Sequence, residues 1–358
     1  FGADTADRRE LLIQAWYPAV PAPDAEPMPR FAGDRYLELL TDYMELPPFI
    51  LDHANLVASH SYHRAPGVAG QRFPVILFNH GYIGHVAQNT IQMEELASHG
   101  YIVLSIAHPY ESMLVTYPDG REVPFAELHV DAALTEAPLE LWEAYSAAEG
   151  EPARDRALAD YLAASTLLNQ TVALWTADNR FVLDQLAALD RDHALLAGRL
   201  DLERIAVMGM SFGGGVAGQV CLQDRRCKAV LNLDGLQNGD LLTGQLDQPY
   251  MMLLNEEAGA FVNSFMLRRS RDTVYRLTVA DTTHLDFSDF TTLSSTFRHI
   301  GMLGAISTER VVAITNTYMV GFLDKHLKGR EVPLLDGPSS DFTEVRFEVS
   351  RVRAAIRR

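Results

Sequence analysis

Residues 205–215 have the sequence Ile205-Ala206-Val207-Met208-Gly209-Met210-Ser211-Phe212-Gly213-Gly214-Gly215. An apolar run ends at Gly209, Ser211 follows two positions later, and glycines then open a segment of small residues. This order predicts a strand, a sharp turn and a helix that packs closely on a sheet. The G-x-S-x-G spacing has a steric cause, because only glycine-sized neighbours let strand and helix approach across so tight a turn. We therefore expect Ser211 to be a nucleophile at the carboxyl end of a strand, rather than part of an ordinary glycine-rich turn.

Short apolar runs on both sides of this stretch predict the rest of the sheet. Residues 73–79 and 101–107 have the pattern of strands buried on both faces, and a helical pattern from Asn89 or Thr90 to Gly100 lies between them. Strand, helix and strand form a βαβ unit, so the sheet is expected to be mostly parallel. Further strands are predicted at residues 11–17, 228–235, 249–257 and 273–279, and a final helix should begin at Ser307 and end near Gly329.

Residues 121–180 interrupt this alternation. They are acidic and alanine-rich at first, and from Pro152 to Leu189 apolar or small residues recur at the spacing of one helical face. We read a single α/β domain over residues 1–358 with a helical insertion at 121–180. The insertion could arch over the active site as a lid, or it could be plain packing.

Composition limits the partners and the compartment. Asp and Glu number 47 against 30 Lys and Arg, a net charge of -17 that argues against nucleic-acid partners. No apolar run is long enough to cross a membrane, and no signal-peptide pattern begins the chain, which we expect to be a mature or trimmed form. Cys221 and Cys227 are close enough in sequence to bridge the turn between them. A disulfide predicts a secreted or periplasmic protein, whereas two free thiols would indicate a cytoplasmic one.

A serine nucleophile needs a general base and a carboxylate that orients it. In chain order the base should follow the last strand, where His284 stands, so we assign it that role. Three of the histidines that precede the serine lie at or just after predicted strand ends and are expected instead, with Tyr110, to line the pocket: His80, His85 and His108. No cluster of His, Cys and carboxylates has the spacing of metal ligands, and no cofactor is predicted.

The carboxylate is left open by the sequence pattern. Asp234 ends the strand after the predicted turn and helix, while Glu256 and Glu257 end the next strand, where hydrolases more commonly carry the acid. Asp281 and Asp286 are further alternatives because they neighbour His284 in sequence.

Backbone N–H groups should stabilise the developing oxyanion. Tyr82 follows His80-Gly81 at the end of a predicted strand, and Phe212 follows the nucleophile, so the amides of Tyr82 and Phe212 are the expected pair. Their side chains would then shape the pocket rather than the oxyanion hole itself.

Several segments together resemble one family, the secreted calcium-independent platelet-activating factor acetylhydrolases and their bacterial esterase relatives. The likeness covers residues 73–110 and 205–290, and it lies in the motifs at residues 80–82, 96–103, 209–214, 233–235 and 284–290. It implies an α/β-hydrolase fold, and it implies Asp234 as the acid.

The sequence therefore predicts a serine carboxylic ester hydrolase with the triad Ser211, Asp234 and His284. Expected substrates are short-chain or oxidised acyl esters, including phospholipids like platelet-activating factor, with polyester chains as the alternative. A binding module on an inactive hydrolase scaffold is disfavoured because both serine and histidine are present. A peptidase of the prolyl-oligopeptidase kind is disfavoured because no propeller-sized N-terminal domain precedes the hydrolase segment. The sequence does not indicate an oligomeric state.

Overall fold

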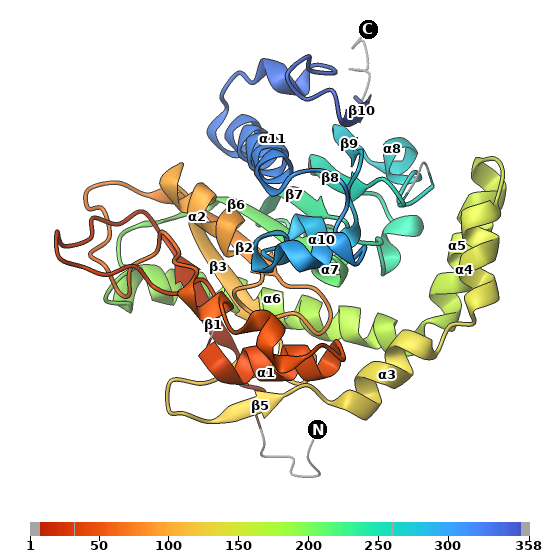
Figure 1. Ribbon diagram of the computed structural model, residues 1–358. Coiled ribbons are helices and arrows are strands. Elements are labelled where there is room, and N and C mark those ends of the chain that lie inside the picture. Colours follow the sequence, from red (N-terminus) through yellow and green to blue (C-terminus); the bar gives the residue numbers. More distant parts are fainter. Residues whose placement is uncertain (1–7, 32, 259–260, 352–358) are drawn as a thin grey trace, which may run out of the picture.

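The structure, a computed structural model, describes residues 8–31, 33–258 and 261–351 (Figure 1). Its main sheet has eight strands in the order β1-β3-β2-β6-β7-β8-β9-β10. The strands from β3 to β9 run parallel, whereas β1 pairs antiparallel with β3 and β10 pairs antiparallel with β9. The strand bounds are β1 Leu12–Trp16, β2 Phe73–Asn79, β3 Ile102–Ala107, β6 Leu200–Met210, β7 Cys227–Leu233, β8 Tyr250–Asn255, β9 Val274–Val279 and β10 Val345–Ser350.

The central strands are apolar on both sides because both faces of the sheet are covered. In β2, Val75 and Leu77 belong to one buried cluster, while Ile76 and Phe78 belong to the cluster on the opposite face. This alternation is the period of two that a strand imposes on its side chains. All four side chains are fully buried, which explains why the run reads as continuously apolar in the sequence.

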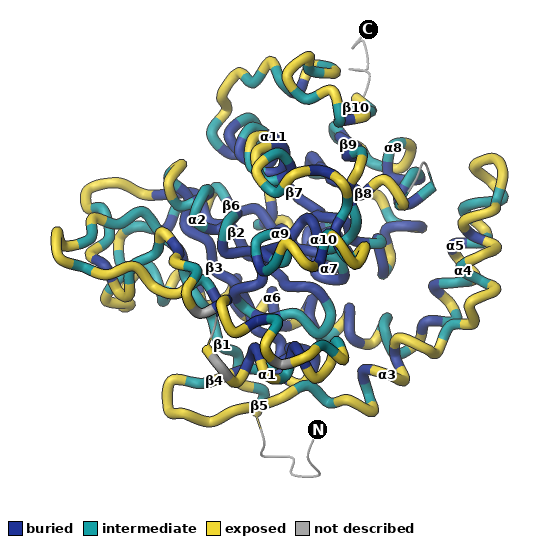
Figure 2. Tube along the Cα trace, in the orientation of Figure 1, coloured by how far each residue is buried: buried dark blue, intermediate teal, exposed yellow. Residues whose placement is uncertain are grey.

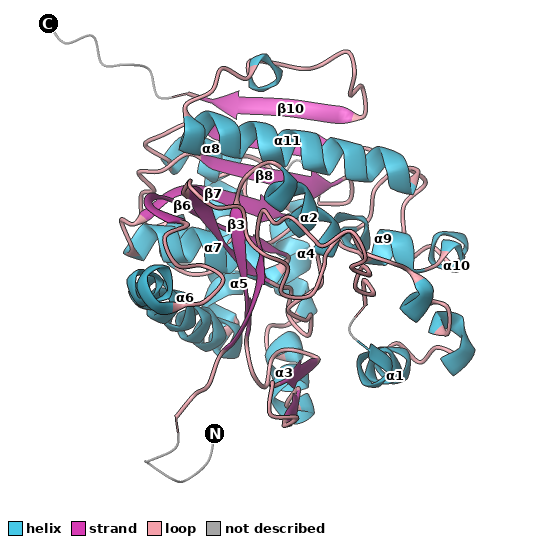
Figure 3. Cartoon of the chain, turned by 90° about the vertical axis from the view of Figure 1, so that its left-hand side faces the viewer, coloured by secondary structure: helices cyan, strands magenta, loops and turns pink. Residues whose placement is uncertain are grey.

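Helices cover the two faces of the sheet (Figure 3). On one face α6 (Thr166–Asp192) packs against α7 (Phe212–Gln223), which lies on β6 and β7. On the other face α11 (Thr308–Lys328) contacts α2 (Thr90–Ser98) and the same two strands. The predicted ends of α11 are confirmed, since the Ser307 hydroxyl accepts from Arg310 N–H at 3.2 Å and Gly329 closes the helix with a positive φ of 65°.

The insertion forms a small hairpin and a series of helices that lead away from the sheet (Figure 1). The hairpin pairs β4 Leu114–Thr116, just before the insertion, with β5 Glu122–Pro124, and the helices are α3 Glu127–Thr135, α4 Leu139–Ala147 and α5 Glu151–Ala164. The single long helix predicted from Pro152 to Leu189 is wrong, because the chain breaks at Ser165 between α5 and α6. The Ser165 hydroxyl donates to the Tyr161 carbonyl and the Asn169 side-chain amide donates to the Leu162 carbonyl, so side chains supply additional bonds to the last turn of α5 at the break.

The paired helices α4 and α5 are exposed over much of their length (Figure 2). A hydrogen bond and ion pairs nevertheless connect them to another part of the chain. The Tyr145 hydroxyl donates to the Phe261 carbonyl at 3.1 Å, and Arg268 pairs with Glu151 and Asp155 at 2.8 and 2.7 Å. These contacts join the insertion to the segment that follows β8. The lid role of residues 121–180 stays a prediction.

The sequence did not predict the secondary structure of two regions, one between β1 and β2 and one near the C-terminal end of the described chain. Between β1 and β2 lie α1 (Gly33–Tyr43) and two 3-10 turns, η1 and η2. At the other end β10 completes the sheet edge, and its alternation of Val345, Phe347 and Val349 with polar residues is a strand signal that we did not use. The remaining short elements are η1 Pro48–Leu51, η2 Ala54–Leu56, η3 Asp240–Leu242, α8 Met266–Arg269, η4 His284–Phe287, α9 Phe290–Leu293, α10 Ser295–His299 and η5 Pro333–Leu335.

Candidate active site

Ser211 occupies a strained turn between β6 and α7. Its φ of 56° and ψ of -126° place a non-glycine residue in a region that L-amino acids rarely adopt. The turn is held by the Ser211 N–H, which donates to the Leu233 carbonyl at 2.7 Å, and by its own carbonyl, which accepts from Gly214 N–H at 2.9 Å. A side chain at Gly209 would overlap the backbone of Gly213, so the glycines of the motif are required by close packing.

His284 lies between Ser211 and Asp234. Its Nε2 is 2.8 Å from Ser211 Oγ, and its Nδ1 is 2.6 Å from Asp234 Oδ2. An ionised carboxylate can only accept, so Nδ1 carries the ring proton and Nε2 is left to accept from the serine hydroxyl. The His284 side chain is 43% exposed while that of Asp234 is 2% exposed, so the histidine is open to solvent and its carboxylate is not.

Asp234 is held in place by the end of the neighbouring strand. The backbone N–H of Asn255 donates to Oδ1 at 2.7 Å, and the Asn255 side-chain amide donates to Oδ2 at 2.6 Å. Asp234 itself adopts a positive φ of 55°, which turns the chain at the end of β7. The next residue, Gly235, lies so close to Ser211 that a side chain there would overlap the Ser211 carbonyl. The sequence did not single out Asn255, although it directly precedes the Glu256 that we considered.

The alternative carboxylates are directed elsewhere. Glu256 accepts the backbone N–H of Asp281 at 2.9 Å, and Glu257 is exposed. Asp286 accepts from the backbone N–H groups of Thr283 and Gly304, both at 2.8 Å. Among the described residues, Asp234 is therefore the carboxylate that is hydrogen-bonded to His284.

The segment His80-Gly81-Tyr82 packs directly beside the serine. A side-chain carbon on Gly81 would lie 3.2 Å from Ser211 Cβ. The Gly81 carbonyl accepts from His80 Nδ1 at 2.7 Å and from Gly84 N–H at 2.8 Å, which fixes the peptide unit that carries the Tyr82 N–H. In the described part of the chain, neither the Tyr82 nor the Phe212 backbone N–H has an acceptor.

His80 and His108 are both fully buried, and their role in lining the pocket stays a prediction. His108 Nδ1 is 2.8 Å from Asp178 of α6, its ring stacks on Trp175 at 3.8 Å, and Asp178 also binds Arg9. Burial lowers the pKa of His108, although Asp178 opposes the change, and burial holds the pKa of His80 well below its usual range. Both rings are hydrogen-bonded within the core, His80 to the Gly81 carbonyl and His108 to the Asp178 carboxylate.

His85 lies in the loop between β2 and α2, and Tyr110 lies in the loop that follows β3. His85 is buried against the ring of Tyr36 at 4.0 Å between centroids, and burial lowers its pKa to about 3. Tyr110 is exposed and has a φ of 76°, in the turn after β3. Of the predicted pocket residues, Tyr110 is thus the one with substantial exposure.

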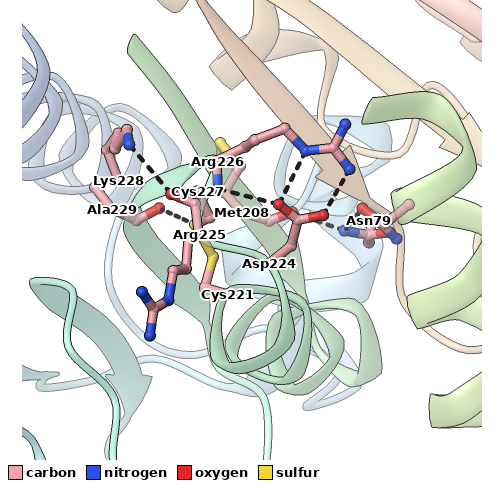
Figure 4. Close-up of a disulfide and its surroundings, with 10 residues drawn as sticks. Asn79, Met208, Cys221, Asp224, Arg225, Arg226, Cys227, Lys228 and Ala229 are labelled. Carbon is pink, nitrogen blue, oxygen red and sulfur yellow. Dashed lines mark hydrogen bonds and ion pairs between the residues drawn. A yellow bond between two sulfur atoms is a disulfide. The ribbon is translucent and has the colours of Figure 1, made fainter. Parts of the chain in front are cut away.

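A disulfide joins Cys221 and Cys227, as the sequence predicted (Figure 4). It links the end of α7 to the start of β7 across a Cα separation of 5.2 Å, and both cysteines are buried. Within the loop, Asp224 accepts two side-chain bonds from Arg226 at 2.9 and 2.6 Å. The covalent link therefore closes a turn that is already organised by an ion pair.

No helix in the part of the chain that the structure describes is long and apolar enough to cross a membrane. Over the same residues, no three His, Cys, Asp or Glu side chains are grouped so that they could hold a metal ion.

Comparison with known proteins gives consistent matches. The model of the family described as platelet-activating factor acetylhydrolase, isoform II, matches residues 36–333. The platelet-activating factor acetylhydrolase of Bos taurus is 27% identical over 271 residues, which are 72% of this chain but only 58% of the bovine protein. That of Gallus gallus is 23% identical over 337 residues, covering 90% of this chain and 80% of the relative.

A solved structure, the ferulic acid esterase from Streptomyces cinnamoneus, superposes with a TM-score of 0.73 at 27% identity. The match covers 95% of this chain and 89% of the esterase. With the mostly parallel sheet and its flanking helices, this likeness confirms the predicted α/β-hydrolase fold.

Proposed function

Because the chain belongs to the platelet-activating factor acetylhydrolase, isoform II, family, we propose that it is a serine carboxylic ester hydrolase. Ser211 is the nucleophile, His284 the general base and Asp234 the residue that orients the base. One observation carries the proposal: the continuous hydrogen-bonded chain from Ser211 Oγ through the imidazole to Asp234, with contacts of 2.8 and 2.6 Å.

The reaction proceeds through an acyl-enzyme. Ser211 Oγ attacks the ester carbonyl carbon while His284 Nε2 takes the hydroxyl proton, and Asp234 stabilises the imidazolium that forms. Collapse of the tetrahedral intermediate breaks the bond to the leaving alcohol, which receives that proton. Water then attacks the acyl group with His284 again as base, and the carboxylic acid leaves as Ser211 recovers its proton.

The Tyr82 and Phe212 backbone N–H groups bind the oxyanion. Two features support this role: neither amide has an acceptor in the described chain, and the Gly81 backbone lies against Ser211 Cβ. Because the Gly81 carbonyl is held by His80 and Gly84, the Tyr82 N–H is fixed before substrate arrives. Such preorganisation lets the donors act without a reorganisation cost during reaction.

The substrates are short-chain or oxidised acyl esters, including phospholipids like platelet-activating factor. The names of the Bos taurus and Gallus gallus relatives support this class. Aromatic side chains gather beside the nucleophile, with the Tyr82 and Phe212 rings 5.2 Å apart and Trp175 5.1 Å from Phe212. The similarity to a ferulic acid esterase supports a second candidate, an ester of an aromatic acid.

The disulfide supports a site of action outside a reducing cytoplasm, and we propose export on that ground. Disulfides of this kind persist in oxidising compartments and are rare where glutathione keeps thiols reduced.

A substrate panel tests the proposal. Purified protein should be assayed on p-nitrophenyl esters from acetate to palmitate, a phospholipid with an sn-2 acetyl group, methyl ferulate and a soluble polyester oligomer. We expect turnover of short acyl esters and of the phospholipid, with kcat/KM falling as the acyl chain lengthens. A preference for ferulate or for the polyester would replace the proposed substrate class, and no hydrolysis of any ester would contradict the function itself.

A further inference from the structure

Gln88 connects the loop that carries Tyr82 to the rest of the site. It lies just before α2, is 9% exposed, and accepts the Gly81 backbone N–H on Oε1 at 2.7 Å. Both glycines of this loop make room for its amide, since a side chain on Gly84 would overlap Gln88 Oε1. Because Oε1 accepts a backbone N–H, the other amide position is the Nε2 donor.

The Nε2 group lies on the same side of Gly81 as the nucleophile. A side-chain carbon on Gly81 would be 3.3 Å from Gln88 Nε2 and 3.2 Å from Ser211 Cβ. Within the described residues Gln88 Nε2 has no hydrogen-bond acceptor. The atom is nevertheless not fully shielded from solvent. A donor beside the serine is therefore available to a substrate atom.

The backbone of Gln88 is fixed to the loop that carries His284. Its carbonyl accepts the Asp289 N–H at 3.0 Å, and its N–H donates to the His85 carbonyl at 3.0 Å. The carboxylate of Asp289 also binds the first N–H groups of α2, those of Thr90 and Ile91, at 2.9 and 3.1 Å. The side-chain amide is thus held on a rigid support, which a catalytic donor requires.

We propose that Gln88 Nε2–H donates a third hydrogen bond to the substrate oxyanion, beside the Tyr82 and Phe212 amides. This inference rests on the proposed hydrolase function and deepens it. The Oε1 atom orients the Gly81 peptide, and the Nε2 atom contacts the reacting carbonyl oxygen. Gln88 is on this account a catalytic residue, because it touches the group on which charge develops.

Two variants separate the donor role from the orienting role. Gln88→Glu keeps an oxygen acceptor for the Gly81 N–H but replaces the donor with an anionic oxygen, and Gln88→Leu removes both. With p-nitrophenyl acetate we expect kcat to fall about 10²-fold in both variants with little change in KM, the effect of losing one oxyanion donor. Affinity for a trifluoromethyl ketone, which mimics the tetrahedral intermediate, should fall in parallel.

The pH profile of Gln88→Glu gives a signature that a structural role would not produce. A protonated carboxyl can donate to the oxyanion whereas an ionised one repels it, so the kcat of this variant relative to wild type should rise as pH falls. Gln92→Glu is the matched control, because Gln92 is a buried glutamine of α2, four residues after Gln88, whose Oε1 accepts from Asn89. That variant should keep its kcat.

Each kcat is calculated per mole of enzyme whose Ser211 reacts with a fluorophosphonate. A Gln88→Glu enzyme with wild-type kcat and wild-type ketone affinity would overturn the proposal and leave Gln88 as an orienting residue. If Gln88→Glu does not fold, equal kcat in Gln88→Leu and wild type would overturn it instead. Failure of the hydrolase function itself is distinguishable, since it would appear as turnover that persists in Ser211→Ala.

Discussion

Asp289 caps the helix that begins at Thr90, with its Oδ2 2.9 Å from the Thr90 backbone nitrogen. The Asn89 side chain at the usual capping position instead donates to the Phe287 carbonyl at 2.6 Å. These contacts tie the segment that carries His284 to the loop that carries Tyr82. The relative position of the base and the oxyanion donors is therefore set by bonds between residues about 200 apart in the chain.

The buried Asp289 should make stability depend on pH. Burial raises its pKa to about 7, against the opposing backbone N–H groups of Ile91 and Thr90. Since the unfolded value is about 3.9, the folded state prefers the protonated form, and its contribution to stability is lost as pH rises from about 4 through about 7. The unfolding free energy of wild type minus that of Asp289→Asn should therefore fall over this range, by about 3 kcal/mol between pH 5 and pH 8. Urea denaturation at pH 5 and pH 8 measures it, and a difference that is flat or rises with pH would contradict the assignment.

Asp234→Asn should lower kcat by about 10³- to 10⁴-fold with little change in KM. The amide keeps the shape of the side chain but favours the wrong imidazole tautomer in His284. Glu256→Gln is the matched control, because Glu256 bonds the Asp281 backbone rather than the histidine, and it should be nearly silent. Steady-state kinetics on one ester decide the matter. Full activity in Asp234→Asn beside a crippled Glu256→Gln would reverse the choice of acid.

Removing the disulfide should cost stability but not activity. The double variant Cys221→Ala, Cys227→Ala opens a short loop, and loop-closure entropy predicts a loss of about 2 kcal/mol. Cys221 lies near the end of α7 away from Ser211, ten residues further along and thus roughly 15 Å away at the rise of an α-helix, so kcat should be unchanged. Equilibrium unfolding and mass spectrometry without reductant provide the test. Two alkylatable thiols in never-reduced wild-type protein would remove the basis for the proposed export.

The sequence predicted the framework of the site because its signals are local. The strand, turn and glycines around Ser211 lie within eleven residues, and the order of serine, acid and histidine along the chain restricted the base to His284. The choice of Asp234 over Glu256 depended on resemblance to a family, since each residue directly follows a strand.

The parts that the sequence did not predict depend on contacts between distant residues. Gln88, Asn255 and Asp289 have no distinctive local pattern, and their roles appear only when the loops meet. The break at Ser165 was missed because helical periodicity continues on both sides of it. His80 and His108 precede the serine at strand ends, but their burial beneath Trp175 follows from the packing of α6.

The most direct test of the account is covalent labelling of the nucleophile. The protein should be inactivated with a fluorophosphonate, digested and mapped by mass spectrometry, with purified Ser211→Ala treated in parallel. We predict one label per chain on Ser211, loss of esterase activity in proportion to labelling, and neither label nor turnover in the folded variant. Label on another residue, or ester turnover by Ser211→Ala, would contradict the central claim.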